Sequence, residues 1–150
     1  MNIIYANMPV PRPMPRLSVF LAGPTPRDKE TKSWRPNAVK ILKKLKYTGT
    51  VILPEYNPMP THVDYDTQVE WEHEALTHVT WIVFWVPREL KKMPAFTTNV
   101  EFGRFAHEWR TLYGRPDDAP KNRYLDWWYS KCHPHRIIAH DLESLLKQII

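Results

Sequence analysis

One glutamate stands out among the residues that could carry chemistry. Glu101 lies in the segment TTNVEFG between Val100 and Phe102, so both of its neighbours are apolar. An acid in such a setting is either a partly buried carboxylate that serves a ligand or an acid that simply favours the start of a helix. The apolar flanks favour the partly buried, functional carboxylate.

Three other polar groups carry weaker signals. Arg88 follows the apolar run WIVFWVP and could bind a phosphate or clamp a carboxylate, or it could belong to an ordinary surface loop. The string CHPH (residues 132–135) lacks the paired ligand spacing that is typical of zinc sites. The string HVDYD (residues 62–66) could bind a hard cation, but it occurs once, in a Pro-rich loop. We therefore expect no metal site and no cofactor.

Composition and charge exclude several classes of protein. With 150 residues, of which 43% are hydrophobic and 25% charged, the chain is expected to form one globular domain over residues 1–150. The net charge is +5, but the densest basic cluster, in residues 40–46, falls on the polar side of a predicted helix, so a nucleic-acid polymer is not an expected partner. Cys132 is the single cysteine, which fits a reducing compartment.

No membrane partner is expected either, because no apolar run approaches the roughly 18 residues that a membrane span requires. The first 16 residues lack the apolar core of a signal peptide. We therefore predict a cytoplasmic protein.

The elements that must position Glu101 alternate between strands and helices. Apolar runs predict strands at residues 17–23, 50–55, 81–86, 110–114 and 136–140. Residues 1–16 contain PVPRPMPR, whose prolines disfavour both helix and central strand, and form an arm or an edge segment. The pattern predicts an α/β fold with an open, parallel, five-stranded sheet flanked by helices.

Helices are expected between these strands. Residues 33–47, 67–78 and 123–131 show helical spacing, and Asp141 is the expected cap of a last helix. A further helix is expected to begin at Thr98 or Asn99, which places Glu101 in its first turn. In open parallel sheets ligands bind beyond the carboxyl ends of the strands, so Glu101 is expected at the rim of that crevice.

Several motifs in this order resemble the nucleoside 2-deoxyribosyltransferase-like family, and most closely its branch found in phages and bacteria. The motifs are FLAGP (20–24), WE (71–72), FWVPR (84–88), TTNVEFG (97–103) and GRPDDAPKNRYLD (114–126). The resemblance spans about residues 19–129. It implies a flavodoxin-like sheet, a nucleoside or nucleotide substrate, and cleavage or exchange of the N-glycosidic bond. It also implies a homo-oligomer, dimeric or larger, which a phage-encoded protein would form in the host cytoplasm.

The resemblance also assigns roles to residues. Glu101 corresponds to the nucleophile that forms a covalent glycosyl intermediate, and Glu72 to a second helix carboxylate that assists departure of the base. Retaining glycosyl transfer uses two carboxyl groups about 5 Å apart. A place in the first helical turn would keep Glu101 ionised, and Gly103 would admit another backbone. The expected substrate-binding residues are Gly23, Pro24, Thr25, Trp71, Arg88, Thr97, Thr98 and Asn99.

The segment before Glu101 departs from the family pattern. Family transferases commonly carry an Asp-Gly-Thr or Asp-Gly-Ser type segment there, whereas this chain has AFTTNVE, with Ala95 where an Asp helps to recognise the base. Base selection then differs, or the activity has shifted toward hydrolysis or been lost. A nucleotide-binding module without catalysis is one alternative. Cleavage of NAD, with stacking on Trp71, Trp81 or Trp85, is another.

Overall fold

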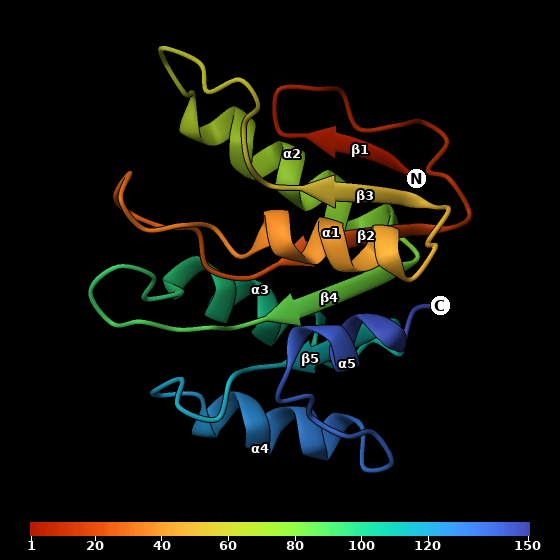
Figure 1. Cartoon of the computed structure of the whole chain (residues 1–150), viewed down its shortest axis with the longest axis vertical. Helices are drawn as coiled ribbons and strands as arrows, with labels where there is room; N and C mark the ends of the chain where they lie inside the picture. Colours follow the sequence, from red (N-terminus) through yellow and green to blue (C-terminus); the bar gives the residue numbers. More distant parts are fainter.

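Five parallel strands form the sheet of the computed structural model, which describes residues 1–150 (Figure 1). The strands are β1 (Asn2–Tyr5), β2 (Ser18–Ala22), β3 (Thr50–Leu53), β4 (Trp81–Trp85) and β5 (Thr111–Gly114). The helices are α1 (Arg35–Lys44), α2 (Tyr65–His78), α3 (Phe96–Phe105), α4 (Arg123–Cys132) and α5 (Leu142–Lys147). The strand order is β1-β3-β2-β4-β5, and every pair is parallel. The expected α/β, flavodoxin-like fold is thereby confirmed.

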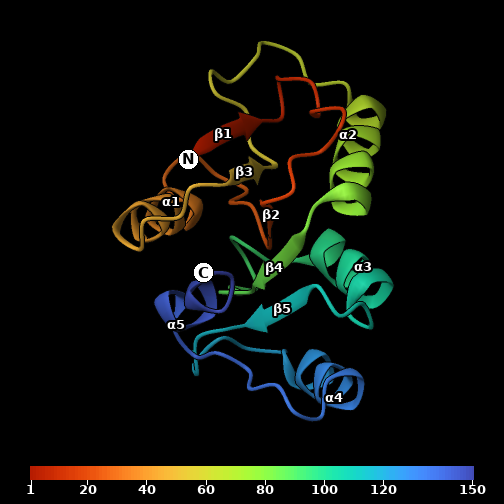
Figure 2. The same cartoon turned by 90° about the vertical axis from the view of Figure 1, so that its right-hand side faces the viewer.

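Helices cover both faces of this sheet, as the apolar strands require. Figure 2 shows α2, α3 and α4 on one face and α1 with α5 on the other. Alternate residues of β2 supply the two cores: Phe20 packs in the cluster on the α2 side and Leu21 in the cluster on the α1 side. Each such fully buried side chain contributes roughly 2 kcal/mol of transfer free energy. Both clusters together fix the strands whose carboxyl ends form the site.

The crevice follows from the direction in which two neighbouring strands continue. β2 leads to α1 on one face, whereas β4, its neighbour in the sheet, leads to α3 on the opposite face. Adjacent loops that diverge to opposite faces leave a gap beyond the carboxyl ends of their strands. The loop that follows β2 and the segment that precedes α3 therefore face each other across this gap.

The predicted strand at residues 136–140 is wrong. Only Ala139 pairs with the sheet there, through a single parallel bridge to Gly114. Arg136 closes a turn onto His133, and Ile137 is 82% exposed because no helix covers it. Ile138 and Ala139 still pack against the two cores, but one bridge does not make a strand.

The fifth strand lies at the opposite edge of the sheet. β1 pairs along its whole length with β3, and Ile4 is buried. The proline-rich residues follow this strand and do not interrupt it, so the N-terminal segment is an edge strand with an arm after it. The cap expected at Asp141 is confirmed, because its carboxylate accepts the backbone N–H of Ser144 at 2.8 Å. None of the helices has both the length and the apolar character that crossing a bilayer would need.

Two glycines at functional motifs are constrained very differently. Gly23 has a φ of +147°, and a Cβ there would lie 2.1 Å from the carbonyl oxygen of Trp85. Gly103 lies exposed on α3, and a Cβ there would meet no atom within 4 Å. The close backbone approach expected at Gly103 is therefore wrong, whereas Gly23 is required where the loop leaves β2.

This contrast gives a matched pair of substitutions. Gly23→Ala forces the loop away from β4 and is expected to lower the free energy of unfolding by more than about 2 kcal/mol. Gly103→Ala fills open space on a helix and is expected to raise it by about 0.5–1 kcal/mol. Urea unfolding measures both values. Equal effects of the two substitutions would contradict the packing described at Gly23.

Candidate active site

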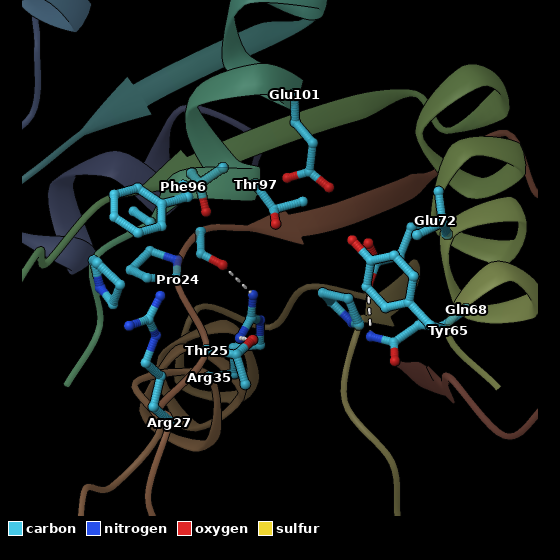
Figure 3. Close-up of a pocket in the computed structure, with 16 residues that line it drawn as sticks. Pro24, Thr25, Arg27, Arg35, Tyr65, Gln68, Glu72, Phe96, Thr97 and Glu101 are labelled. Carbon is cyan, nitrogen blue, oxygen red and sulfur yellow. Dashed lines mark hydrogen bonds between the residues drawn. The ribbon is translucent and has the colours of Figure 1, made fainter. Parts of the chain in front are cut away.

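A cavity of about 300 Å³ opens at the carboxyl ends of the strands, between the loop after β2 and the helices α2 and α3 (Figure 3). Its lining includes seven of the ten residues expected from the sequence: Gly23, Pro24, Thr25, Glu72, Thr97, Thr98 and Glu101. The structure thus brings together residues that are almost 80 positions apart in the chain. The topology of the sheet accounts for this, because the rim of the crevice is where these loops meet.

Two carboxylates project into this cavity from different helices. Glu101 comes from α3 and Glu72 from α2, and both side chains point into the same space (Figure 3). Burial raises the pKa of Glu101 to about 8, and the negative charge of Glu72 adds to this effect. Burial also raises the pKa of Glu72, although a hydrogen bond from Gln68 Nε2 at 2.9 Å stabilises its carboxylate. At neutral pH the pair therefore retains a proton.

The position of Glu101 on its helix differs from the sequence expectation. α3 begins at Phe96, with Ala95 as the N-cap in the left-handed conformation at a φ of 63°. Glu101 is thus in the second turn, where the helix dipole has less effect than at the free N–H groups of the first turn. The expectation that the dipole keeps Glu101 ionised is wrong, because desolvation dominates and raises the pKa.

The cation opposite the two acids is Arg35, which the sequence analysis missed. Its side chain is only 1% exposed and donates to the carbonyl oxygens of Leu21 and Gly23 and to Glu55 at 2.7–3.0 Å. The charge of Arg35 also lowers the pKa of both Glu72 and Glu101, against the larger effect of burial. Arg35 therefore holds the loops after β2 and β3 together and partly compensates the two acids.

A signal for Arg35 was present in the sequence. It is the first residue of α1, where the helix dipole disfavours a positive charge. A cation in that place, directly after Trp34 and before Pro36, indicates a side chain that is held by other parts of the protein. Other lining residues that no sequence pattern indicated include Arg27, Tyr65, Gln68 and Phe96.

Three expected substrate-binding residues do not line the cavity. Trp71 packs against Phe20 and donates its indole N–H to the carbonyl oxygen of Met8 at 2.7 Å. Arg88 is buried and donates to the carbonyl oxygen of Pro94 at 2.8 Å and to the side chain of Asn99 at 2.7 Å. Arg88 and Asn99 thus bind each other and fix the start of α3.

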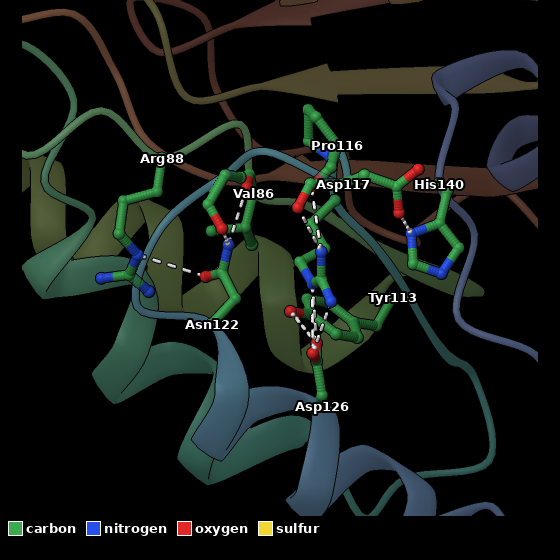
Figure 4. Close-up of polar contacts among 10 residues, drawn as sticks. Val86, Arg88, Tyr113, Pro116, Asp117, Asn122, Asp126 and His140 are labelled. Atoms are coloured by element: carbon green, nitrogen blue, oxygen red, sulfur yellow. Dashed lines mark hydrogen bonds and ion pairs between the residues drawn. The ribbon is translucent and has the colours of Figure 1, made fainter.

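Residues of the motif GRPDDAPKNRYLD hold Arg88 in place through polar contacts (Figure 4). Asn122, the N-cap residue of α4, accepts a hydrogen bond from Arg88 Nε at 3.2 Å and donates to the carbonyl oxygen of Val86 at 3.4 Å. Asp126 accepts hydrogen bonds from Arg115 and from the hydroxyl of Tyr113. This motif therefore anchors α4 and, through Arg88, the segment that carries Glu101.

The metal-like strings of the sequence do not assemble into a site. No three His, Cys, Asp or Glu side chains in the structure lie close enough to hold a metal ion together. In the string CHPH, the ring Nε2 of His133 lies 2.7 Å from the carbonyl oxygen of Ala106, in a buried contact between α4 and the end of α3. This histidine therefore has a structural contact of its own.

The raised pKa of Glu101 predicts a stability that depends on pH. Because the pKa rises from 4.5 to about 8 on folding, the folded protein binds more protons between these values and loses stability as the pH rises through them. Glu101→Gln removes this loss, so we expect the variant to be more stable than the wild type at pH 8, by on the order of a few kcal/mol, and equally stable near pH 4. Urea unfolding from pH 4 to 9 measures the difference. A matched control is Glu70→Gln on the exposed face of α2, and the same pH trend in that control would refute the assignment.

Comparison with known proteins agrees with this geometry. The family model for nucleoside 2-deoxyribosyltransferase-like proteins matches residues 16–119, more than two thirds of the chain and all of the cavity lining. A search of curated proteins gave no match. The family indicates an enzyme of the glycosyl-transfer type with nucleoside substrates. On this match, the chain belongs to the nucleoside 2-deoxyribosyltransferase-like family.

Proposed function

We propose that this protein breaks the N-glycosidic bond of a nucleoside or nucleotide through a covalent glycosyl intermediate on Glu101. The observation that carries the proposal is the pair of carboxyl groups, Glu101 and Glu72, that α3 and α2 direct into one cavity. Two acids with raised pKa values in a shared cleft are the groups that a glycosyl transfer uses.

The first half of the reaction uses the pair in two protonation states. The ionised carboxylate of Glu101 attacks C1′, a C–O bond forms, and the C–N bond to the base breaks with its electron pair going to the base. Glu72 in its acid form gives its proton to the departing base. The free pair holds a proton at neutral pH, and this proton must be on Glu72 or on the base when Glu101 attacks.

The second half returns the enzyme to its starting state. Water or the nitrogen of a second base attacks C1′, Glu72 accepts the proton that the acceptor releases, and the C–O bond to Glu101 breaks. Arg35 stabilises negative charge in both halves, because it remains beside the two acids and is fixed by its own hydrogen bonds. No metal is needed for these steps.

An apolar groove next to the cavity provides a place for the base. It lies between α2 and α3 and is lined in part by Val69, Leu76, Val100 and Phe105. Glu72 and Glu101 line both the groove and the polar cavity, so the acids stand where the two spaces join. A flat, largely apolar base in the groove would place C1′ at the acids and the rest of the sugar in the polar cavity.

The nucleophile is tested by removing Glu101. Wild-type protein incubated with deoxynucleosides and their 5′-monophosphates is expected to release free base, which chromatography detects. Glu101→Gln is expected to reduce release at least roughly 1,000-fold, because no carboxylate remains to attack C1′. Glu70→Gln is the matched control and should retain full activity.

Two results would refute the assignment of Glu101. One is a Glu101→Gln protein that turns over a substrate as fast as the wild type. The other is an inactive wild type whose bound nucleotide is recovered intact after long incubation, which would support the binding-module alternative. With a slow substrate, the intact mass of acid-quenched wild type should increase by one glycosyl group, and this increase should be absent from Glu101→Gln.

Glu72 is tested through the pH dependence of the reaction. The negative charge of Glu72 raises the pKa of Glu101, so Glu72→Gln should lower that pKa. We expect the rising acidic limb of kcat/KM to move to lower pH in Glu72→Gln, together with a lower plateau because the proton donor is gone. An acidic limb at the wild-type pH would show that the two groups do not titrate together. Glu70→Gln again serves as the control.

A further inference from the structure

We propose that the substrate is a nucleoside 5′-monophosphate whose phosphate is bound at the end of the cavity away from the two acids, by Arg27, Thr25 and the start of α3. This proposal rests on the proposed function of the cavity and names its substrate class. It is carried by the chemistry of that end of the cavity, where Arg27 and Thr25 provide hydrogen-bond donors and Glu72 lies on the other side (Figure 3).

Arg27 provides an uncompensated positive charge. It lines the cavity, its guanidinium lies 5.3 Å from the ring centre of Phe96, and it forms no ion pair within the protein (Figure 3). The nearest acid along the chain, Asp28, accepts the backbone N–H groups of Glu30 and Thr31. Phe96 therefore holds the guanidinium at the cavity while its N–H groups remain free for a ligand.

Backbone contacts fix the loop that carries Arg27. The N–H of Arg27 donates to the carbonyl oxygen of Lys92 at 2.9 Å, and Lys92 belongs to a turn closed by pairing of Glu89 with Met93. The loop after β2 is thus tied to the loop after β4. This contact holds Arg27 in place beside the cavity.

Thr25 is oriented as a donor. Its hydroxyl oxygen accepts a hydrogen bond from Arg35 NH1 at 3.1 Å. Because the hydroxyl oxygen of Thr25 already accepts from Arg35, its hydrogen does not point toward Arg35 and is free to point into the cavity. A phosphate oxygen is a suitable acceptor for it.

The start of α3 supplies the remaining donors. Thr98 is only 3% exposed and lines the cavity, yet its hydroxyl has no hydrogen-bond partner within the protein. The N-cap residue Ala95 offers no side-chain oxygen to the first turn, so the N–H groups of Phe96 and Thr97 lack a capping partner. A hydroxyl without a partner in the protein, beside free N–H groups at a helix N-terminus, is a setting that binds phosphate.

The order of the subsites matches a nucleotide. The apolar groove and the polar cavity share Glu72 and Glu101, and only the polar cavity extends to Arg27, Thr25 and Thr98. Base, C1′ and 5′-phosphate follow one another in the same order in a nucleoside monophosphate. A nucleoside without phosphate would leave Arg27 and Thr98 without partners.

The experiment measures catalysis and binding separately. Base release by the wild type is compared for deoxynucleosides and the corresponding 5′-monophosphates, and binding of both is measured by calorimetry with the Glu101→Gln protein. The same measurements are made with Arg27→Ala or Arg27→Lys, introduced into the wild type for base release and into the Glu101→Gln protein for binding. Arg123→Ala, which removes an exposed positive charge at the start of α4, is the matched control.

We expect the monophosphate to be preferred over the nucleoside, and Arg27→Ala to weaken its binding and its kcat/KM roughly 10- to 100-fold, with a much smaller loss for the nucleoside. Arg27→Lys should reduce the binding and the kcat/KM of the monophosphate less than Arg27→Ala does, because lysine keeps the positive charge but lacks the planar guanidinium that donates two parallel hydrogen bonds. Arg123→Ala should behave as the wild type. Inorganic phosphate should compete with the monophosphate and not with the nucleoside.

The outcomes separate this proposal from the proposed function. Base release without preference for the monophosphate, or an equal loss for both substrates in Arg27→Ala, overturns the phosphate site and leaves the glycosyl chemistry standing. Tight, Arg27-dependent binding of the monophosphate without any base release supports the phosphate site and refutes the chemistry.

Discussion

The structure of the site depends on one buried cation. Arg35 has almost no contact with solvent, so the protein itself must supply the partners that water would provide. It does so with two carbonyl oxygens at the end of β2 and with the carboxylate of Glu55 after β3. Removing one partner of such a buried pair costs about 3–5 kcal/mol. The loops that form the floor of the cavity are therefore fixed before any ligand arrives.

The same cation sets the electrostatics of the two acids. Glu72 and Glu101 repel each other and lose solvation in the cavity, and both effects raise their pKa values. Arg35 opposes this without a direct hydrogen bond to either carboxylate, so the acids remain free to bind a substrate and to exchange a proton. Burial of these two acids lowers the free energy of unfolding of the free protein, and a ligand that binds them offsets this loss. Such a destabilising arrangement is typical of functional sites.

The sequence predicted the parts of the molecule that depend on local pattern. Apart from Ser18, the residues of β2 and β4 are apolar, and both strands lie inside the sheet. Glu101 and Glu72 reach the cavity, as the motifs implied. The two edges were less predictable. NIIY and RIIAH have similar strand character, yet the first pairs with β3 along its whole length and the second makes a single bridge, from Ala139 to Gly114.

Other features depend on tertiary structure and carry little local signal. The start of α3 is set by the hydrogen bonds of Arg88 to Pro94 and Asn99, which join segments that no sequence pattern connects. Arg88 and Trp71 lie outside the cavity for a similar reason, because their polar atoms are bound to other parts of the protein. Burial also outweighs the helix dipole at Glu101, and burial is a property of the assembled fold.

The backbone at Ala95 has a consequence for how this site can evolve. Alanine there adopts a left-handed conformation that costs it about 1–2 kcal/mol and that Asp, Asn and Gly tolerate better. Ala95 also lines the cavity. Asp or Asn at this position would therefore fit the main chain with less strain than alanine and would add a polar group to the cavity lining without rearrangement of the scaffold.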